Sequence, residues 1–134
     1  MNKMLIAAVA VSSAALLSSA SAFAADECSN ASLKGHYTYW LQGADANGKA
    51  YAEVGQEHYD GAGNATSKIA VAGSDKMDED KATYTVNGDC SGTVTYASGA
   101  SYHIFVAPGG DSFVFSSSKA GVVQAGENTR VDKD

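Results

Sequence analysis

Three histidines, His36, His58 and His103, are the first residues in this sequence that suggest chemistry. His36 and His58 would face each other if the strands that carry them pair, and three imidazoles would suit zinc. None of them lies in a short ligand spacing such as H-x-H or H-E-x-x-H, and each neighbours or alternates with aromatic residues. We therefore expect ordinary strand histidines, no metal site and no cofactor.

Glu53 and Glu57 form a second group, because they alternate with Tyr51 and Tyr59 along one stretch of chain. If that face points inward, the two carboxylates lie in an aromatic pocket, where burial would raise their pKa values as acid–base catalysis requires. If it points outward, they are surface charges. Val54 and its apolar neighbour at position 52 favour the outward orientation, although this leaves two tyrosines exposed.

No nucleophile is marked in the sequence. The chain has no G-x-S-x-G motif, and pairing of the two cysteines would leave none to act with a histidine. We therefore expect no catalytic residue and a protein that is not an enzyme.

Two polar clusters are expected to be structural. Residues 75–81 hold four acidic side chains but lack the spacing and distal glutamate of a calcium loop, so we expect a solvated loop between strands. The Asp-Gly-Ala-Gly-Asn sequence at residues 60–64 is predicted to be a turn, because its glycines allow positive φ.

The N-terminus has the three zones of a cleaved signal peptide. Lys3 supplies a positive charge, residues 4–17 are mostly apolar, and Ala22-Phe23-Ala24 gives the small-x-small pattern before cleavage. We expect cleavage after Ala24, with Ala22 as the alternative. The apolar run is too short to span a bilayer, which needs about 20 residues. Export to the periplasm or the extracellular space of a bacterium is expected.

Residues 25–134 are then expected to form a single domain. The formal net charge is −6 for the whole chain, and becomes −7 when Lys3 is removed with the signal peptide. An acidic domain does not suit nucleic acid or an anionic membrane as a partner.

The two cysteines, Cys28 and Cys90, are predicted to form a disulfide, because an exported chain with an even cysteine count usually pairs them. The alternative is two free thiols. The bond would attach the start of the mature chain to the middle of the domain. Reduction should then loosen the first strand before the rest.

The remaining sequence is typical of an all-β protein. Short runs rich in Tyr, Val, Thr and Phe alternate with turn clusters, as in an antiparallel up-and-down meander. We expect eight strands, which must close or stack because open edges promote aggregation. The predicted strands are residues 35–43, 51–60, 65–73, 81–87, 91–98, 101–108, 111–117 and 121–131.

Several of these strands have period-two patterns, which predict one face toward the interior. A closed eight-stranded barrel has an interior that side chains just fill, or that holds one small ligand. Six aromatic residues are the candidates for the interior, where they would either line a ligand pocket or form a packed core. They are Tyr37, Tyr39, Tyr84, Tyr102, Phe113 and Phe115.

The motifs resemble a family of small secreted bacterial proteins with an allene oxide cyclase-like barrel, a calycin-type fold. The similarity lies in Cys28 followed by Leu-Lys-Gly-His-Tyr, in Tyr59-Asp-Gly-Ala-Gly-Asn, and in Tyr84-Thr-Val-Asn-Gly-Asp-Cys-Ser-Gly-Thr. It covers most of the mature chain and departs at Ala82, where the family has Gly. These turn and strand signatures imply the fold and the disulfide. None of the pocket residues of the plant cyclase or the bacterial spirocyclases is matched.

We expect an exported, non-enzymatic barrel that binds a small apolar ligand or docks to a protein partner through exposed tyrosines. One rival is a cyclase or isomerase-like enzyme, by analogy of fold alone, which requires an open cavity with Glu57 or His58 directed into it. Another is a surface component that self-associates through a strand edge.

Overall fold

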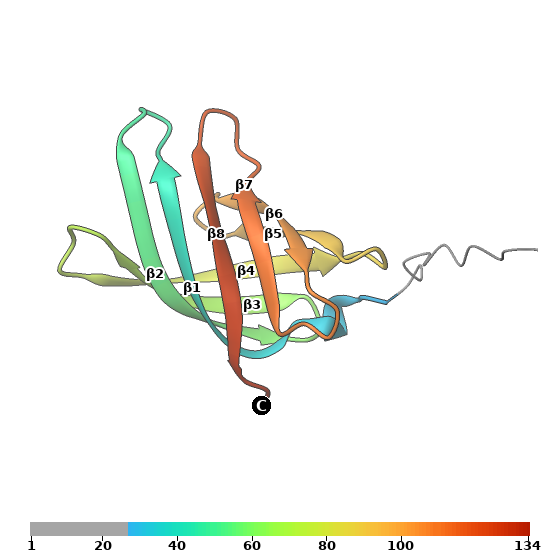
Figure 1. Cartoon of the computed structure of the whole chain (residues 1–134). Coiled ribbons are helices and arrows are strands. Elements are labelled where there is room, and N and C mark those ends of the chain that lie inside the picture. The colour runs from blue at the N-terminus through green and yellow to red at the C-terminus, as the bar shows by residue number, and fades with distance from the viewer. Residues whose placement is uncertain (1–26) are drawn as a thin grey trace, which may run out of the picture.

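The structure, a computed structural model, describes residues 27–134. The predicted signal peptide, residues 1–24, lies outside them. Eight antiparallel strands follow one another in a meander and close into a barrel, as the sequence predicts (Figure 1). The strands are β1 (Lys34–Ala44), β2 (Ala50–Asp60), β3 (Asn64–Val71), β4 (Met77–Val86), β5 (Ser91–Tyr96), β6 (Ser101–Val106), β7 (Ser112–Ser117) and β8 (Val123–Asp132), preceded by a short 3₁₀ helix, η1 (Asn30–Ser32).

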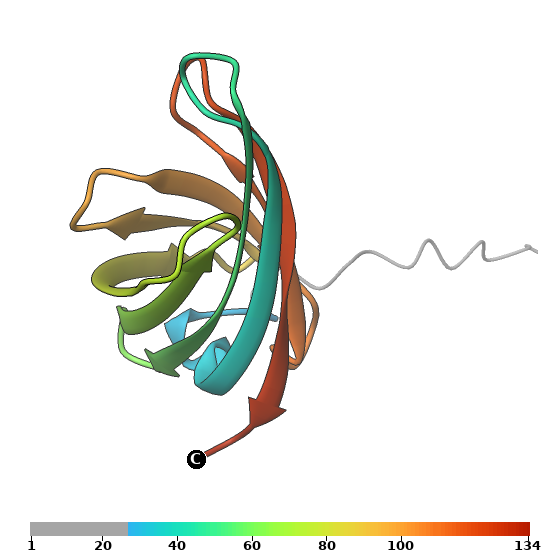
Figure 2. The same cartoon turned by 90° about the vertical axis from the view of Figure 1, so that its left-hand side faces the viewer.

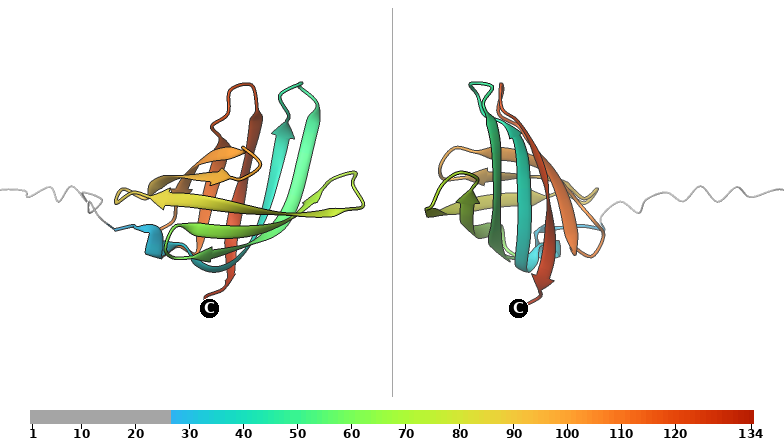
Figure 3. Two further views of the ribbon diagram at one scale, coloured as in Figure 1. Left: turned by 180° about the vertical axis from the view of Figure 1, so that it is seen from behind. Right: turned by 60° about the vertical axis from the view of Figure 1, so that its left-hand side comes forward.

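The barrel closes where β8 pairs with β1, from Ala44 opposite Val123 to His36 opposite Asp132. The β1–β2 and β7–β8 loops therefore lie side by side at one end (Figure 2). The end of β8 and the segment that contains η1 lie at the opposite end (Figure 3). Within residues 27–134, no helix is long and apolar enough to cross a membrane.

The period-two pattern predicts the inward faces of most strands correctly. Tyr37, Tyr39 and Leu41 of β1 are buried, while the residues between them are exposed. The same holds for Ala82, Tyr84 and Val86 of β4, and for Phe113 and Phe115 of β7.

The acidic segment differs from its prediction as a loop, because β4 already begins at Met77. Its first residues pair with β3, where Met77 lies opposite Ala70 and Glu79 lies opposite Lys68. Cross-strand pairs of opposite charge stabilise a sheet, so the charged residues extend the strand without leaving solvent.

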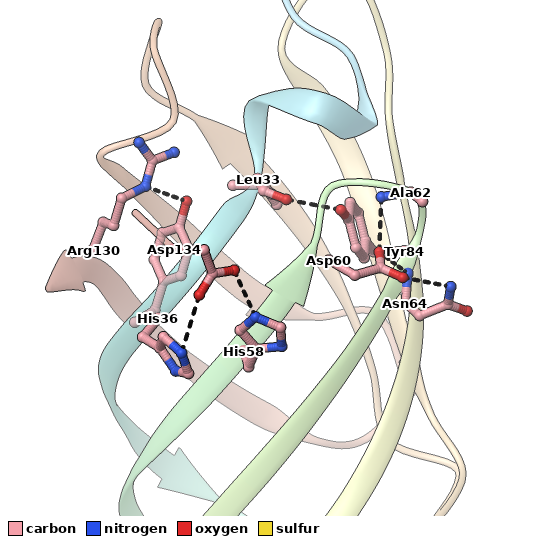
Figure 4. A network of polar contacts seen from close by, with 10 residues as sticks. Leu33, His36, His58, Asp60, Ala62, Asn64, Tyr84, Arg130 and Asp134 are labelled. Carbon is pink, nitrogen blue, oxygen red and sulfur yellow. Dashed lines mark hydrogen bonds and ion pairs between the residues drawn. The ribbon is translucent and has the colours of Figure 1, made fainter. Parts of the chain in front are cut away.

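The turn predicted at residues 60–64 is present. The Asp60 carboxylate accepts hydrogen bonds from the backbone N–H groups of Ala62, at 2.7 Å, and Asn64, at 3.0 Å, and from the Asn64 side chain at 2.8 Å (Figure 4). These bonds, chiefly that from the Asn64 side chain, lower the pKa of Asp60 to about 2.

One end of the barrel is sealed by the segment that precedes β1. The disulfide between Cys28 and Cys90 is confirmed and attaches this segment to the β4–β5 loop. The Tyr84 hydroxyl donates to the carbonyl oxygen of Leu33 at 2.8 Å, and the Val86 N–H donates to the Asn30 side chain at 2.8 Å. Leu33 is completely buried within this segment. Residues 28–33 therefore close this end of the barrel, and we call them the plug.

Candidate functional site

The other half of the barrel contains a cavity of about 630 Å³. It opens at the end formed by the β1–β2, β3–β4, β5–β6 and β7–β8 loops, because its outer lining residues lie at or beside those loops. Tyr59 and Phe113 lie at its floor, and neither Leu33 nor Tyr84 beneath them lines it. The volume lies in the range of pockets that hold a small organic molecule.

Glu57 of β2 is the most deeply buried acid in this cavity, with 2% of its surface exposed. Its carboxylate accepts hydrogen bonds from the hydroxyls of Tyr59, at 2.8 Å, and Tyr96, and from the Asn128 side-chain amide at 3.0 Å. Burial raises the pKa of Glu57, and the three hydrogen bonds oppose that rise.

Glu53 lies nearer the mouth on the same face of β2. Its carboxylate accepts hydrogen bonds from the hydroxyls of Tyr39, at 2.9 Å, and Tyr51. Burial, together with the Glu53 charge, raises the pKa of Tyr39 well above its usual range. The two glutamates thus lie among tyrosines that donate to them.

The predicted outward orientation of the glutamates is therefore wrong. Val54, expected inside, is 56% exposed, whereas Glu57 and Tyr59 are buried. The prediction treated the interior as a purely apolar core, but a barrel with a cavity can hold carboxylates when hydroxyl and amide donors satisfy them. The two tyrosines on the glutamate face were the signal for the correct orientation.

Strand β8 also turns polar residues inward, although its sequence has no apolar alternation that would predict its inner face. Gln124, Gly126, Asn128 and Arg130 alternate along its inner face, while Val123 and Val131 point to solvent. The Asn128 amide donates to Glu57, but its carbonyl oxygen Oδ1 has no hydrogen-bond partner within residues 27–134.

Glycines on β2 and β8 make room for aromatic rings in the wall. A Cβ atom on Gly55 would lie 2.5 Å from the Tyr39 ring, and one on Gly126 would lie 2.6 Å from the Phe115 ring. A glycine inside a strand often marks such close approach, so these positions carried a signal for the inner face.

Four of the six candidate interior residues line the cavity, namely Tyr39, Tyr102, Phe113 and Phe115. Tyr102 packs edge-to-face on Phe115, with ring centroids 5.3 Å apart, and burial raises the pKa of Tyr102 to about 12.

The other two, Tyr37 and Tyr84, belong to the sealed end. The Tyr37 hydroxyl donates to the carbonyl oxygen of Gly110 at 2.6 Å and accepts from Arg130 at 3.0 Å. Arg130 also donates to the Ser32 carbonyl at 2.9 Å, which joins β8 to the plug.

The histidines do not form a three-membered site. His103 lies on β6, away from the other two, whereas His36 and His58 face each other across β1 and β2. Their Nε2 atoms lie 3.1 Å and 2.7 Å from different oxygens of the Asp134 carboxylate (Figure 4). Two imidazoles and one carboxylate are a donor set that suits zinc, but this cluster is on the outer surface and separate from the cavity.

The tyrosines do not form an exposed docking surface, contrary to that expectation. They are buried or partly buried on the inner face of the barrel. Large exposed apolar residues lie instead on the outer face, where Trp40 is opposite Val54 and Phe105 is opposite Val114.

Comparison of the chain with protein-family models, with curated proteins and with solved structures finds no match.

Proposed function

We propose that the protein binds a small, mostly apolar molecule inside its barrel. The observation that supports this proposal is the open cavity of about 630 Å³, whose walls combine Phe and Tyr rings with two carboxylates. Pockets for small molecules are mostly apolar, with a few placed polar groups that orient the ligand. Glu53 and Glu57 are such groups.

The test is native mass spectrometry of the protein purified from the periplasm or medium of its own cells. We expect an adduct that is released on denaturation. A matched pair of variants locates it: Ala100→Trp fills the rim of the cavity and should abolish the adduct, whereas Ala125→Trp changes the outer face of β8 and should retain it. Repeated empty spectra of the wild-type protein would count against the proposal.

Acid–base catalysis by a cyclase or isomerase-like enzyme is the second candidate, because Glu57 faces the cavity and its pKa is raised by burial. A general acid or base needs a pKa moved toward the working pH. His58 has no part in this candidate, since its imidazole lies at the outer surface beside Asp134. Chemical analysis of the bound molecule before and after incubation distinguishes the two. Conversion by the wild type but not by Glu57→Gln would identify an enzyme, and an unchanged ligand would identify a binding protein.

We also propose that the protein is exported and belongs to the calycin-type, allene oxide cyclase-like barrels. Support comes from the eight-stranded antiparallel barrel and from the disulfide, a bond that forms in oxidising compartments. The intact mass of the secreted protein tests export. We expect the mass of residues 25–134, or of 23–134 if cleavage follows Ala22, with two hydrogens lost to the disulfide. A mass that includes residue 1 would contradict cleavage.

A further inference from the structure

The charges around the cavity are strongly biased toward one sign. Glu53 and Glu57 line its wall, and Asp78, Glu79 and Asp80 of β4 line its mouth. Among the described residues that line the cavity, Lys119 is the only basic one. Since a cleft lined by one sign of charge concentrates ions of the other sign, the mouth favours entry of a cation.

The five tyrosine hydroxyls that line the upper wall and the site of Glu57 already donate to other groups. Tyr39 and Tyr51 donate to Glu53, Tyr59 and Tyr96 donate to Glu57, and the Tyr102 hydroxyl donates to Gln124 at 3.3 Å. A hydroxyl has only one proton to donate, so these tyrosines offer a ligand only their acceptor capacity.

Acceptors, in contrast, remain free. Asn128 is 2% exposed and lines the cavity, and its Oδ1 atom has no partner within the described part of the chain. The amide is held in this orientation because its NH₂ group donates to Glu57. A buried acceptor without a donor costs free energy, so the site is incomplete until a donor arrives. An ionised carboxylate can accept about four hydrogen bonds, so Glu57, with three, can accept one more.

Aromatic rings line the same cavity as these acceptors. Tyr96 and Tyr102 pack edge-to-face with centroids 5.9 Å apart, and Phe115 lies 6.4 Å from Tyr39. Ring faces attract cations, and more strongly when the cation is desolvated. The same rings supply apolar area for the uncharged part of a ligand.

We propose that the ligand is a protonated primary amine on an aromatic or apolar body. This inference rests on the proposed function and names its ligand class. The ammonium group donates to Glu57 and to Asn128 Oδ1, and the body packs toward the mouth against Tyr102 and Phe115. A neutral or anionic ligand of the same shape has neither a positive charge nor the N–H groups of an ammonium. It therefore cannot satisfy these acceptors in the same way.

Calorimetric titration of the ligand-free, oxidised protein with three probes of similar shape tests the proposal. The probes are tryptamine (cation), tryptophol (neutral) and indole-3-propionate (anion). We expect tryptamine to bind at least about tenfold more tightly than tryptophol, a factor that corresponds to about 1.4 kcal/mol, and indole-3-propionate to bind most weakly. If tryptophol binds as tightly as tryptamine, the amine inference is wrong while the binding function stands. If none of the three binds at millimolar concentration, the amine inference is overturned, whereas the binding function is overturned only if the native mass spectra of the wild-type protein are also empty.

Variants then assign the ammonium position. Glu57→Gln should reduce tryptamine affinity at least about tenfold and leave tryptophol nearly unchanged, whereas Glu127→Gln on the outer face of β8 should change neither. Asn128→Leu, which removes the free acceptor, gives a second measurement if Glu57→Gln fails to fold. Equal losses for tryptamine and tryptophol would contradict the placement of the charge.

Discussion

Glu57 makes the stability of the ligand-free protein depend on pH in a direction that can be worked out. Its pKa in the folded protein lies above the ordinary value of 4.5, so the folded state holds this proton more tightly than the unfolded chain. The stabilisation is complete below pH 4.5 and is lost as the pH rises through the folded-state pKa. A tenfold difference in proton affinity corresponds to about 1.4 kcal/mol.

We therefore predict that Glu57→Gln removes the part of the stability loss at rising pH that Glu57 causes. Denaturant unfolding from pH 4.5 to about pH 8 should show a smaller decline in the free energy of unfolding for the variant than for the wild type. Glu127→Gln is the control, because it removes a carboxylate from the outer face of the same barrel. An identical decline in all three proteins would show that Glu57 titrates as it does in the unfolded chain.

At the scale of the strand, Gly126 is predicted to be necessary for the packing of β8. A Cβ atom there would lie 2.0 Å from the Trp40 carbonyl oxygen and 2.6 Å from the Phe115 ring, so backbone as well as side chain must shift. We expect Gly126→Ala to lower the free energy of unfolding by roughly 1–3 kcal/mol. Ala125→Val, on the outer face of the same strand, should have little effect. Equal stability of both variants would mean that the wall is looser than the structure indicates.

The plug segment leads to a second prediction at this scale. Strand β1 is paired along its length with both β2 and β8, whereas residues 28–33 are held by the disulfide and a few side-chain bonds. Reduction should therefore open residues 28–33 before β1, and should cost roughly 2–4 kcal/mol of stability. Hydrogen exchange measured before and after reduction checks the order. Earlier opening of β6–β8 would contradict this role of the bond.

The sequence pattern predicts the fold better than it predicts the site, for a physical reason. Alternation in β1, β4 and β7 follows apolar burial, so their inner faces can be read directly. Strands β2 and β8 contribute polar side chains to the cavity wall, and there the apolar Val54 and Val123 point to solvent. Arg130 joins Ser32 and Tyr37 only after the barrel closes, so no local pattern marks it.

At the scale of the whole molecule, we predict that the buried tyrosines make the protein unfold at high pH. All seven have pKa values raised above 10.0, and burial is the largest cause in each case. The folded state thus holds seven phenolic protons that the unfolded chain releases near pH 10. Their stabilisation is present below pH 10.0 and is lost as the pH rises above it.

We expect one cooperative alkaline transition, in which tyrosinate absorbance increases at the same pH at which the β-sheet circular dichroism signal is lost. Glu57→Gln should shift this transition only slightly, since the seven tyrosines dominate it. Tyrosinate absorbance that rises near pH 10 while the circular dichroism stays native would contradict burial of the hydroxyls.

The plug and the end of β8 lie at the same end of the barrel, opposite the mouth (Figure 3). A fusion partner or a sensor surface joined beyond Cys28 or Asp134 would therefore leave the entrance to the cavity unobstructed. A linker inserted into the β5–β6 loop, in contrast, would stand in the path of any entering molecule, because Ser98 and Ala100 line the rim. The two ends of the described chain are thus the sites for coupling the protein to a detector, and the hairpin loops around the mouth are the sites for altering what enters.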